Sequence, residues 1–133
     1  MSTTLPVVYD TGALLAAERN DKHFLDRHER LCRQGRSLLV ITPVLAQAWR
    51  NGARQERLAR FLKTCSILAP TERLAYRAGE LIGRSGLSDA VDAMVVAAAF
   101  DRAAIRIVTS DPGDIAKLCE ASGRSMVPAI HTP

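Results

Sequence analysis

Short, continuous apolar runs alternate along this chain with segments in which apolar residues recur every three or four positions. The runs are rich in valine, leucine and isoleucine and lack regular polar alternation, which is typical of strands buried on both faces of a sheet. They predict strands at residues 5–9, 37–42, 64–68, 105–109 and 126–130. The last is expected at a sheet edge, because Pro128 interrupts it.

The helical periodicity occupies the segments between these runs. Pro43 suits the first turn of a helix, and Ser88 suits an N-cap. Gly35 and the pair Asn51-Gly52 are expected to end the helices that precede them. The pattern predicts helices at residues 13–18, 24–34, 43–50, 54–63, 71–83, 88–102 and 114–121.

Alternation of strands and helices favours a parallel sheet with helices on both of its faces. The expected fold class is α/β, a three-layer α/β/α sandwich around a mostly parallel sheet of about four or five strands. The length of 133 residues suits one compact domain, so residues 1–133 are expected to form a single domain. Ligands of such sheets bind at the carboxyl ends of the strands.

Composition narrows the classes of function. Aromatic residues make up only 5% of the chain, which argues against base stacking on an aromatic platform. The longest apolar run, residues 93–100, is too short to cross a bilayer, and residues 1–6 do not resemble a signal peptide. We therefore expect a cytoplasmic protein with no membrane contact. Three widely spaced cysteines encode neither a disulfide framework nor a zinc site.

Four aspartates stand where the predicted sheet would bring them together. Asp10 follows the first strand and Asp111 follows the fourth, while Asp89 and Asp92 lie at the start of the helix that leads into the fourth strand. Each of these aspartates, taken alone, could also serve simply as a helix cap. Two carboxylates about 4 Å apart repel by roughly 4 kcal/mol at an effective dielectric of 20, so a cluster requires protons or a cation. Oxygen ligands without histidine or cysteine indicate Mg²⁺ or Mn²⁺.

Positive charge surrounds this acidic group. The net charge is +4, and 15 of the 18 Lys and Arg residues are arginine, whose planar guanidinium suits phosphate. A basic ridge on the predicted helix 54–63 is a candidate RNA contact, although a solvated helix face would look the same. An acidic, metal-holding pocket in a basic surface suits cleavage of a phosphate backbone. The ridge residues are Arg50, Arg54, Arg57 and Arg60.

Four segments, in order over about 130 residues, resemble the motifs of PIN-domain proteins: VVYDTGALLAAE, ITPVLAQAWR, LSDAVDAMVVAAA and VTSDPGDIAKL. The likeness is greatest to VapC-type toxins of bacterial toxin-antitoxin pairs. This resemblance implies a small α/β/α sandwich and a Mg²⁺- or Mn²⁺-dependent endoribonuclease that acts on RNA. It also implies a small cognate antitoxin as partner and a homodimer.

Carried over by this resemblance, Asp10, Asp92 and Asp111 occupy three acidic positions of the family and are the expected catalytic residues and metal ligands. Asp89 is a further expected metal ligand, and Asp114 a supporting carboxylate. In the resulting mechanism the metal polarises the scissile phosphate and activates a water, which an ionised aspartate orients for in-line attack.

The chain departs from the family at the second acidic position, where Gln47 replaces the usual glutamate. A glutamine offers a carbonyl oxygen but no charge, which weakens metal binding unless Asp89 offsets the loss. Thr11 and Ser110 flank the aspartates and are expected to hydrogen-bond a phosphate or a water, or else the local backbone. The sequence therefore leaves two functions open, an endoribonuclease and a catalytically weak or inactive PIN-like module that binds RNA or protein.

Other families that share short motifs with this chain fit poorly. Residues 10–13, DTGA, also occur in retroviral-type aspartic proteases, but those are all-β chains, and the helical periodicity of residues 54–63 and 88–102 contradicts that fold. A phosphorylated receiver-type site lacks its second aspartate and its lysine. The histidines His23, His28 and His131 are too scattered to predict a zinc site.

Overall fold

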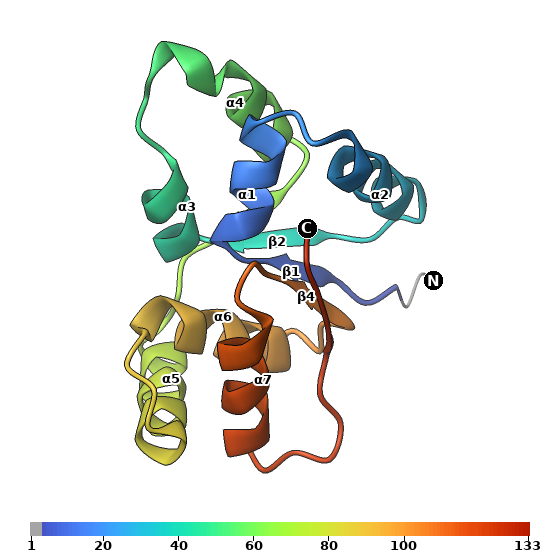
Figure 1. Ribbon diagram of the computed structural model, residues 1–133. Helices are drawn as coiled ribbons and strands as arrows, with labels where there is room; N and C mark the ends of the chain where they lie inside the picture. The colour runs from blue at the N-terminus through green and yellow to red at the C-terminus, as the bar shows by residue number, and fades with distance from the viewer. Residues whose placement is uncertain (1–3) are drawn as a thin grey trace.

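The structure, a computed structural model, describes residues 4–133 and has a five-stranded sheet at its centre (Figure 1). All four strand pairings are parallel, and the strand order is β3-β2-β1-β4-β5. The predicted α/β class is confirmed. The strands are β1 (Val7–Tyr9), β2 (Leu38–Ile41), β3 (Ser66–Leu68), β4 (Arg106–Val108) and β5 (Ala129–His131).

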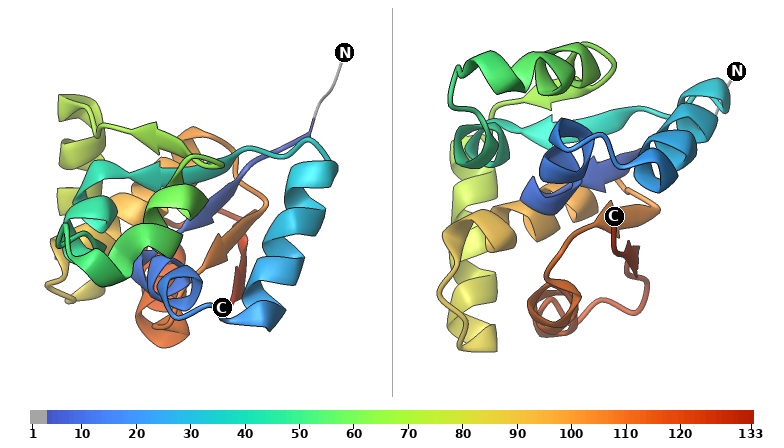
Figure 2. Two further views of the ribbon diagram at one scale, coloured as in Figure 1. Left: turned by 90° about the horizontal axis from the view of Figure 1, so that it is seen from above. Right: turned by 45° about the horizontal axis from the view of Figure 1, so that its top comes forward.

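Helices cover both faces of the sheet, as the alternation of elements predicts (Figures 1 and 2). On one face lie α1 (Thr11–Glu18), α2 (Lys22–Arg33), α3 (Thr42–Ala48), the short 3-10 helix η1 (Ala53–Gln55) and α4 (Glu56–Leu62). On the other lie α5 (Glu72–Ser85), α6 (Ala90–Asp101) and α7 (Pro112–Ala121). None of the helices in residues 4–133 is long and apolar enough to span a membrane.

The central strand β1 explains why the apolar run at residues 5–9 lacks alternation. Val7, Val8 and Tyr9 are all 0% exposed, because helices cover both faces of this strand. The Tyr9 ring packs on Phe24 of α2 and Phe61 of α4, with ring centroids 5.5 and 5.8 Å apart. Since successive side chains of a strand point to opposite faces, Val8 points toward the side covered by α5, α6 and α7.

The start of α6 differs from the prediction. Its N-cap is Asp89 rather than Ser88, because the Asp89 carboxylate accepts hydrogen bonds from the backbone N–H groups of Val91 and Asp92. A carboxylate also interacts favourably with the positive end of the helix dipole. The predicted helix 54–63 divides into η1 and α4.

The last strand begins after Pro128 instead of including it. Proline has no N–H to donate to a neighbouring strand, whereas Ala129 donates its N–H to the carbonyl of Ile105 at 2.9 Å. β5 is therefore Ala129–His131, three residues at the edge of the sheet, and not residues 126–130.

A directional chain of hydrogen bonds crosses the core between β1 and α4. His28, 6% exposed, contacts the Tyr9 hydroxyl through Nδ1 at 2.8 Å and the Thr64 hydroxyl through Nε2 at 2.7 Å. The Thr64 hydroxyl donates to the Phe61 carbonyl, so it accepts from Nε2–H, and Tyr9 donates to Nδ1. Both imidazole nitrogens are thus satisfied by the neutral form, and burial lowers the pKa of His28 to about 4.

Protonation of His28 should destabilise the fold in mild acid. Because the pKa is about 4 in the folded state and 6.5 in the unfolded state, the unfolded state binds more protons between these values, and stability falls as the pH falls through this window. The full loss is on the order of 3 kcal/mol. Urea unfolding of the wild type and of His28→Gln at pH values from 4 to 7 measures this loss of stability. The variant should lack this component of the pH dependence. An identical pH dependence in both proteins would contradict the buried neutral imidazole.

Candidate metal centre

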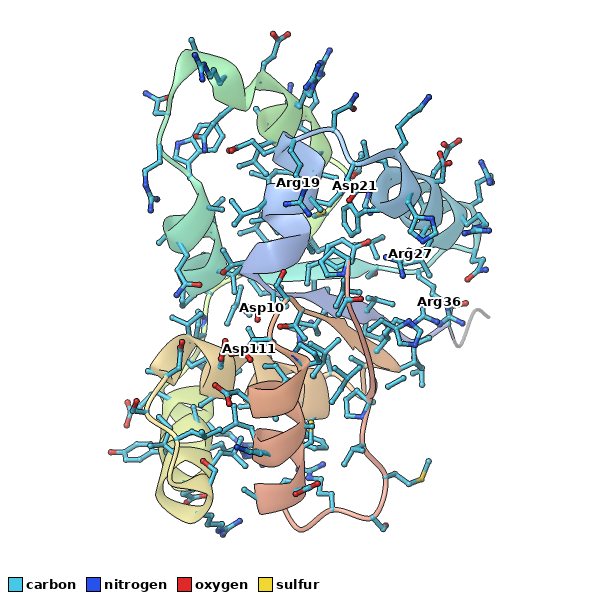
Figure 3. All side chains as sticks on the ribbon, viewed as in Figure 1. Asp10, Arg19, Asp21, Arg27, Arg36 and Asp111 are labelled. Carbon is cyan, nitrogen blue, oxygen red and sulfur yellow. The ribbon has the colours of Figure 1, made fainter. Side chains whose placement is uncertain are left out.

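The carboxyl ends of the neighbouring strands β1 and β4 bring two distant aspartates to one edge of the sheet. Asp10 directly follows β1, and Asp111 follows β4 after Thr109 and Ser110. The backbone N–H of Asp10 donates to the Val108 carbonyl at 2.9 Å, which keeps the two chains paired up to this point. Figure 3 shows Asp10 and Asp111 close to each other at this edge. Helices leave β1 and β4 on opposite faces here, and ligands of parallel sheets bind at such a switch point.

The first turn of α6 adds a third carboxylate. Asp92 is buried, at 7% exposed, because it lies on the side of α6 that faces the sheet. Burial, and then the negative charges of Asp10, Asp89, Asp111 and Asp114, raise its pKa to about 7. A carboxylate whose pKa is raised by four others is short of positive charge, which a bound cation would supply.

The tightest grouping consists of Asp92, Asp111 and Asp114. One carboxylate oxygen from each residue lies within 4.8 Å of the others. Burial and the neighbouring Asp114 also raise the pKa of Asp111. Asp114, expected only as a supporting residue, is thus part of the central group, whereas exposed Asp89 uses its Oδ1 atom to cap α6.

Asp10 lies beside this group and is held by two hydrogen bonds. Its Oδ1 accepts from the backbone N–H of Thr11, and its Oδ2 accepts from the hydroxyl of Thr109, both at 2.8 Å. Thr109 is 0% exposed, and its Oγ1 also accepts the backbone N–H of Asp111 at 3.0 Å. One hydroxyl therefore fixes the positions of both strand-end aspartates.

Sequence reasoning missed Thr109. The motif VTSD was recognised by its aspartate, and the flanking Ser110 was selected as the hydroxyl of interest. Strand alternation is the signal that was available, because Thr109 follows the buried pair Ile107 and Val108 and its β-branched side chain suits burial at the strand end.

Gln47, on α3, is linked to the acidic edge through Thr11. Its Oε1 accepts a short hydrogen bond from the hydroxyl of Thr11, the residue that follows Asp10. Gln47, the residue that departs from the family pattern, and Thr11, one of the two predicted hydroxyls, are therefore hydrogen-bonded to each other. Gln47 is exposed, so its amide nitrogen remains open to solvent, and the pair connects α3 to the start of α1.

Gly12 is required by the close approach of Ser110. A Cβ atom at Gly12 would lie 1.9 Å from the Ser110 Oγ and 2.9 Å from its backbone nitrogen. Only glycine allows α1 to begin this near to the segment that carries Asp111. Ser110 itself is exposed at the same edge, where its hydroxyl faces the first turn of α1.

The predicted basic ridge lies away from the carboxylates. It lines a hollow of about 530 Å³ near the end of α1 opposite to Asp10, and the eight residues of α1 span about 12 Å. The hollow is also lined by acidic Glu18 and Glu56, and Arg60 lies 3.9 Å from Glu56. The ridge arginines among its lining residues are Arg54, Arg57 and Arg60.

Arg50 does not extend the ridge. Its guanidinium donates to the backbone carbonyls of Ala46 and Trp49, at 3.1 and 2.7 Å, and is thus folded back on the end of α3. The backbone N–H of Arg50 is bound by Gln55, whose amide also donates to Glu18 on α1. In this conformation Arg50 helps to join α3 to the rest of its layer.

The arrangement suits a hard divalent cation. Its donors are carboxylate oxygens with no thiol or imidazole nearby, which is the preference of Mg²⁺ and Mn²⁺. The raised pKa values of Asp92 and Asp111 indicate that the charges are uncompensated by the protein itself. The residues present therefore fit such an ion, which would bind beside Asp10 with Asp92, Asp111 and Asp114 as ligands.

Comparison with known proteins places this geometry in a family. The family model of the PIN domain matches residues 7–121. No curated protein matches the sequence.

Solved structures match over most or nearly all of the chain. VapBC2 from Rickettsia felis bound to a DNA fragment from its promoter has a TM-score of 0.75 and 15% identity, covering 97% of this chain and 99% of the other. DNA-bound VapBC from Salmonella typhimurium has a TM-score of 0.68 and 18% identity, covering 97% and 98%. VapC20 of Mycobacterium tuberculosis, a toxin that cleaves the sarcin-ricin loop, has a TM-score of 0.58 and 16% identity, covering 76% and 86%.

These likenesses show a shared fold, and the family model covers all of the sequence that builds the acidic edge, from Asp10 to Asp114. The chain belongs to the PIN domain family, and its fold is that of VapC-type proteins.

Proposed function

We propose that this protein is a divalent-metal-dependent endoribonuclease and the toxin of a VapBC-type toxin-antitoxin pair. The observation that carries the proposal is the cluster of aspartates at the carboxyl edge of β1 and β4, where burial and mutual repulsion raise the pKa of Asp92 to about 7. The PIN family and the structural likeness to a toxin that cleaves RNA support it.

In this proposal Asp10, Asp92 and Asp111 are the catalytic carboxylates. Asp92, Asp111 and Asp114 bind Mg²⁺ or Mn²⁺ most directly, with Asp10 completing the site and Asp89 adding negative charge from the N-cap of α6. When bound, the ion polarises the scissile phosphate and lowers the pKa of a water molecule.

The chain's own residues then orient the reactants. The exposed carboxylate of Asp111 accepts a proton from the attacking water and holds it in line with the scissile bond. Thr109 fixes the position of the Asp10 carboxylate by donating to its Oδ2. Ser110 lies at the rim, where its hydroxyl donates to a phosphate oxygen of the substrate. The Thr11 hydroxyl already donates to Gln47, so its role there is to accept a hydrogen bond from a water.

RNA binding is assigned to the basic surface outside this pocket. The exposed side chains of Arg54, Arg57 and Arg60 line one hollow, and arginine is the residue best suited to phosphate. Arg50 joins them if its guanidinium leaves the carbonyl groups that it contacts.

The partners follow from the relatives. VapBC complexes are among the similar structures, so we infer that a small antitoxin binds this chain, and that the protein forms a homodimer in the cytoplasm.

A second function is favoured by one residue. Gln47 occupies the position of the usual glutamate and binds Thr11 instead of offering a negative charge. A weak metal site would leave a PIN-like module that binds RNA or protein without cutting. The experiments below separate these functions.

Replacing Asp10 by asparagine should abolish cleavage of single-stranded RNA in Mn²⁺, by on the order of 10²-fold or more, because one charge of the metal site is lost. EDTA should have the same effect on the wild type. Asp101→Asn is the matched control, since Asp101 pairs with Arg77 at the other end of α6 and should retain full activity. Cleavage that persists in Asp10→Asn would contradict this site. A wild type that binds RNA without cutting it would favour the second function.

Replacing Asp92 by asparagine should stabilise the metal-free protein. The pKa of about 7 exceeds the unfolded value of 3.8, so the folded state binds more protons between these values and wild-type stability falls as the pH rises from about 4 to 7. At pH 8 without metal, the variant should melt a few degrees higher than wild type. With Mn²⁺ the order should reverse. A variant that is less stable under both conditions would contradict the repulsive cluster.

Replacing Gln47 by glutamate should tighten Mn²⁺ binding roughly tenfold, or about 1.4 kcal/mol, because a charge is added beside Thr11 at the pocket rim. Isothermal titration calorimetry measures the affinity. Gln34→Glu, which adds the same charge at the end of α2, is the control and should leave affinity unchanged. Equal affinities of Gln47→Glu and wild type would show that residue 47 does not face the ion.

A further inference from the structure

Three basic side chains from three elements gather on the face of the sheet that α2 covers. Arg106 of β4 pairs in register with Val7, and His131 of β5 pairs with Val108, the partner of Tyr9. These positions share the face on which Tyr9 packs against α2. Arg27 of α2 reaches the same place, since its guanidinium donates to the Thr132 carbonyl at 2.9 Å. Figure 2 shows the end of the chain beside the start of α2.

No acidic partner balances this group within residues 4–133. None of the ion pairs there includes Arg27 or Arg106. The Nε atom of each arginine is buried and has no hydrogen-bond partner. Burial, and then the charges of Arg106 and Arg27, lower the pKa of His131, which places all three groups within electrostatic reach of one another.

Such a group is costly as it stands. Like charges repel, and a buried donor without an acceptor loses its hydrogen bond to water. Arg33 of the same helix avoids this cost, because it is exposed and donates to Glu29 at 2.8 Å. The arrangement at Arg27 and Arg106 therefore lacks an anion that the described chain does not provide.

The size of the site indicates how an anion would bind. The hollow beneath the two arginines, which Tyr9 and Val108 also line, measures about 10 Å³ and admits no more than a water molecule. Arg27, Arg106 and His131 are each half-buried, so their remaining surface faces solvent. A water in this hollow could accept from the buried Nε atoms, whereas an oxyanion would bind on the open side, to the guanidinium nitrogens that face solvent, where the two uncompensated charges attract it.

The site is connected to the aspartate cluster by the sheet. The carbonyl of His131 accepts the backbone N–H of Thr109 at 2.9 Å, and the hydroxyl of Thr109 donates to Asp10. One member of the basic group, His131, is thus hydrogen-bonded through its backbone to Thr109, the residue that positions Asp10. The ridge on α4 has no such connection, because it lines a hollow at the other end of α1.

We propose that Arg27, Arg106 and His131 form an oxyanion site that binds a backbone phosphate of the RNA strand held at the aspartate cluster. The proposal rests on the proposed ribonuclease function for the identity of the strand. The backbone connection from His131 through Thr109 to Asp10 favours this ligand over an acidic side chain of a partner protein. The anion site itself is testable without RNA.

The first experiment uses inorganic phosphate on the metal-free protein. Millimolar phosphate should raise the melting temperature of the wild type more than sodium chloride of equal ionic strength does. Arg106→Gln and Arg27→Gln should each lose this difference, while Arg33→Gln, which removes one charge from the same helix, should keep it.

If phosphate and chloride act equally on the wild type, or if both site variants respond as the wild type does, there is no anion site here. The lysine variants Arg106→Lys and Arg27→Lys keep the positive charge, so they should retain part of the response. This result would show that the glutamine variants lose the response with the charge and not through misfolding.

The second experiment identifies the source of the phosphate. Binding of a fluorescent single-stranded RNA is measured by anisotropy in the Asp10→Asn background, where cleavage is blocked, at several salt concentrations. Arg106→Gln should weaken binding roughly tenfold and reduce the salt slope by about 0.7, the value for one lost phosphate contact with a single strand. Arg33→Gln should leave the slope unchanged.

The outcomes separate the two proposals. RNA binding that is independent of Arg27 and Arg106, together with competition between phosphate and a polyglutamate peptide, would overturn the RNA assignment in favour of an acidic protein partner. Failure of the wild type to cut RNA, with the phosphate response intact, would count against the ribonuclease alone.

Discussion

Repulsion among carboxylates is the interaction around which this molecule is organised. A parallel sheet places the carboxyl ends of β1 and β4 side by side, so Asp10 and Asp111 meet there, and α6 and α7 add Asp92 and Asp114 from their first turns. Burial, and then these neighbouring carboxylates, raise the pKa of Asp92, which expresses the resulting cost. The fold tolerates this repulsion because other contacts hold each aspartate in place. These are the Thr109 hydroxyl, the first turns of α6 and α7, and the buried strands.

The distribution of charge follows from this centre. The acids are concentrated at one edge, and arginines occupy the surfaces on either side, on α4 and between α2 and β5. A phosphate backbone is attracted to such a surface and excluded from the acidic edge until a cation neutralises it. In the proposed function, RNA binding and metal binding are therefore linked by electrostatics, and Gln47 adds no negative charge to this edge.

Much of the architecture could be predicted because its causes are local. Continuous apolar runs such as the one that ends at Tyr9 predict buried strands, and glycine or proline marks their ends. Alternation of strands and helices implies a parallel sheet, which in turn places residues after β1 and β4 together. This placement brought together Asp10, Asp89, Asp92 and Asp111, and the motifs shared with PIN domains singled out Asp10, Asp92 and Asp111 among them. Predicted boundaries were wrong where a hydrogen bond decided them, as at Asp89 and Pro128.

The sequence by itself thus determined the class of fold, the order of elements and the edge at which the acids meet, since periodicity and chain direction are properties of the chain alone. Only the tertiary structure decided that Thr109 holds Asp10 and that Asp114 rather than Asp89 joins the central group. It also decided that Arg27, Arg106 and His131 meet without a counter-ion in the described part of the chain. Arg27 and the Thr132 carbonyl that it binds are 105 positions apart, and such contacts depend on how α2, α7 and β5 pack, which no local pattern encodes.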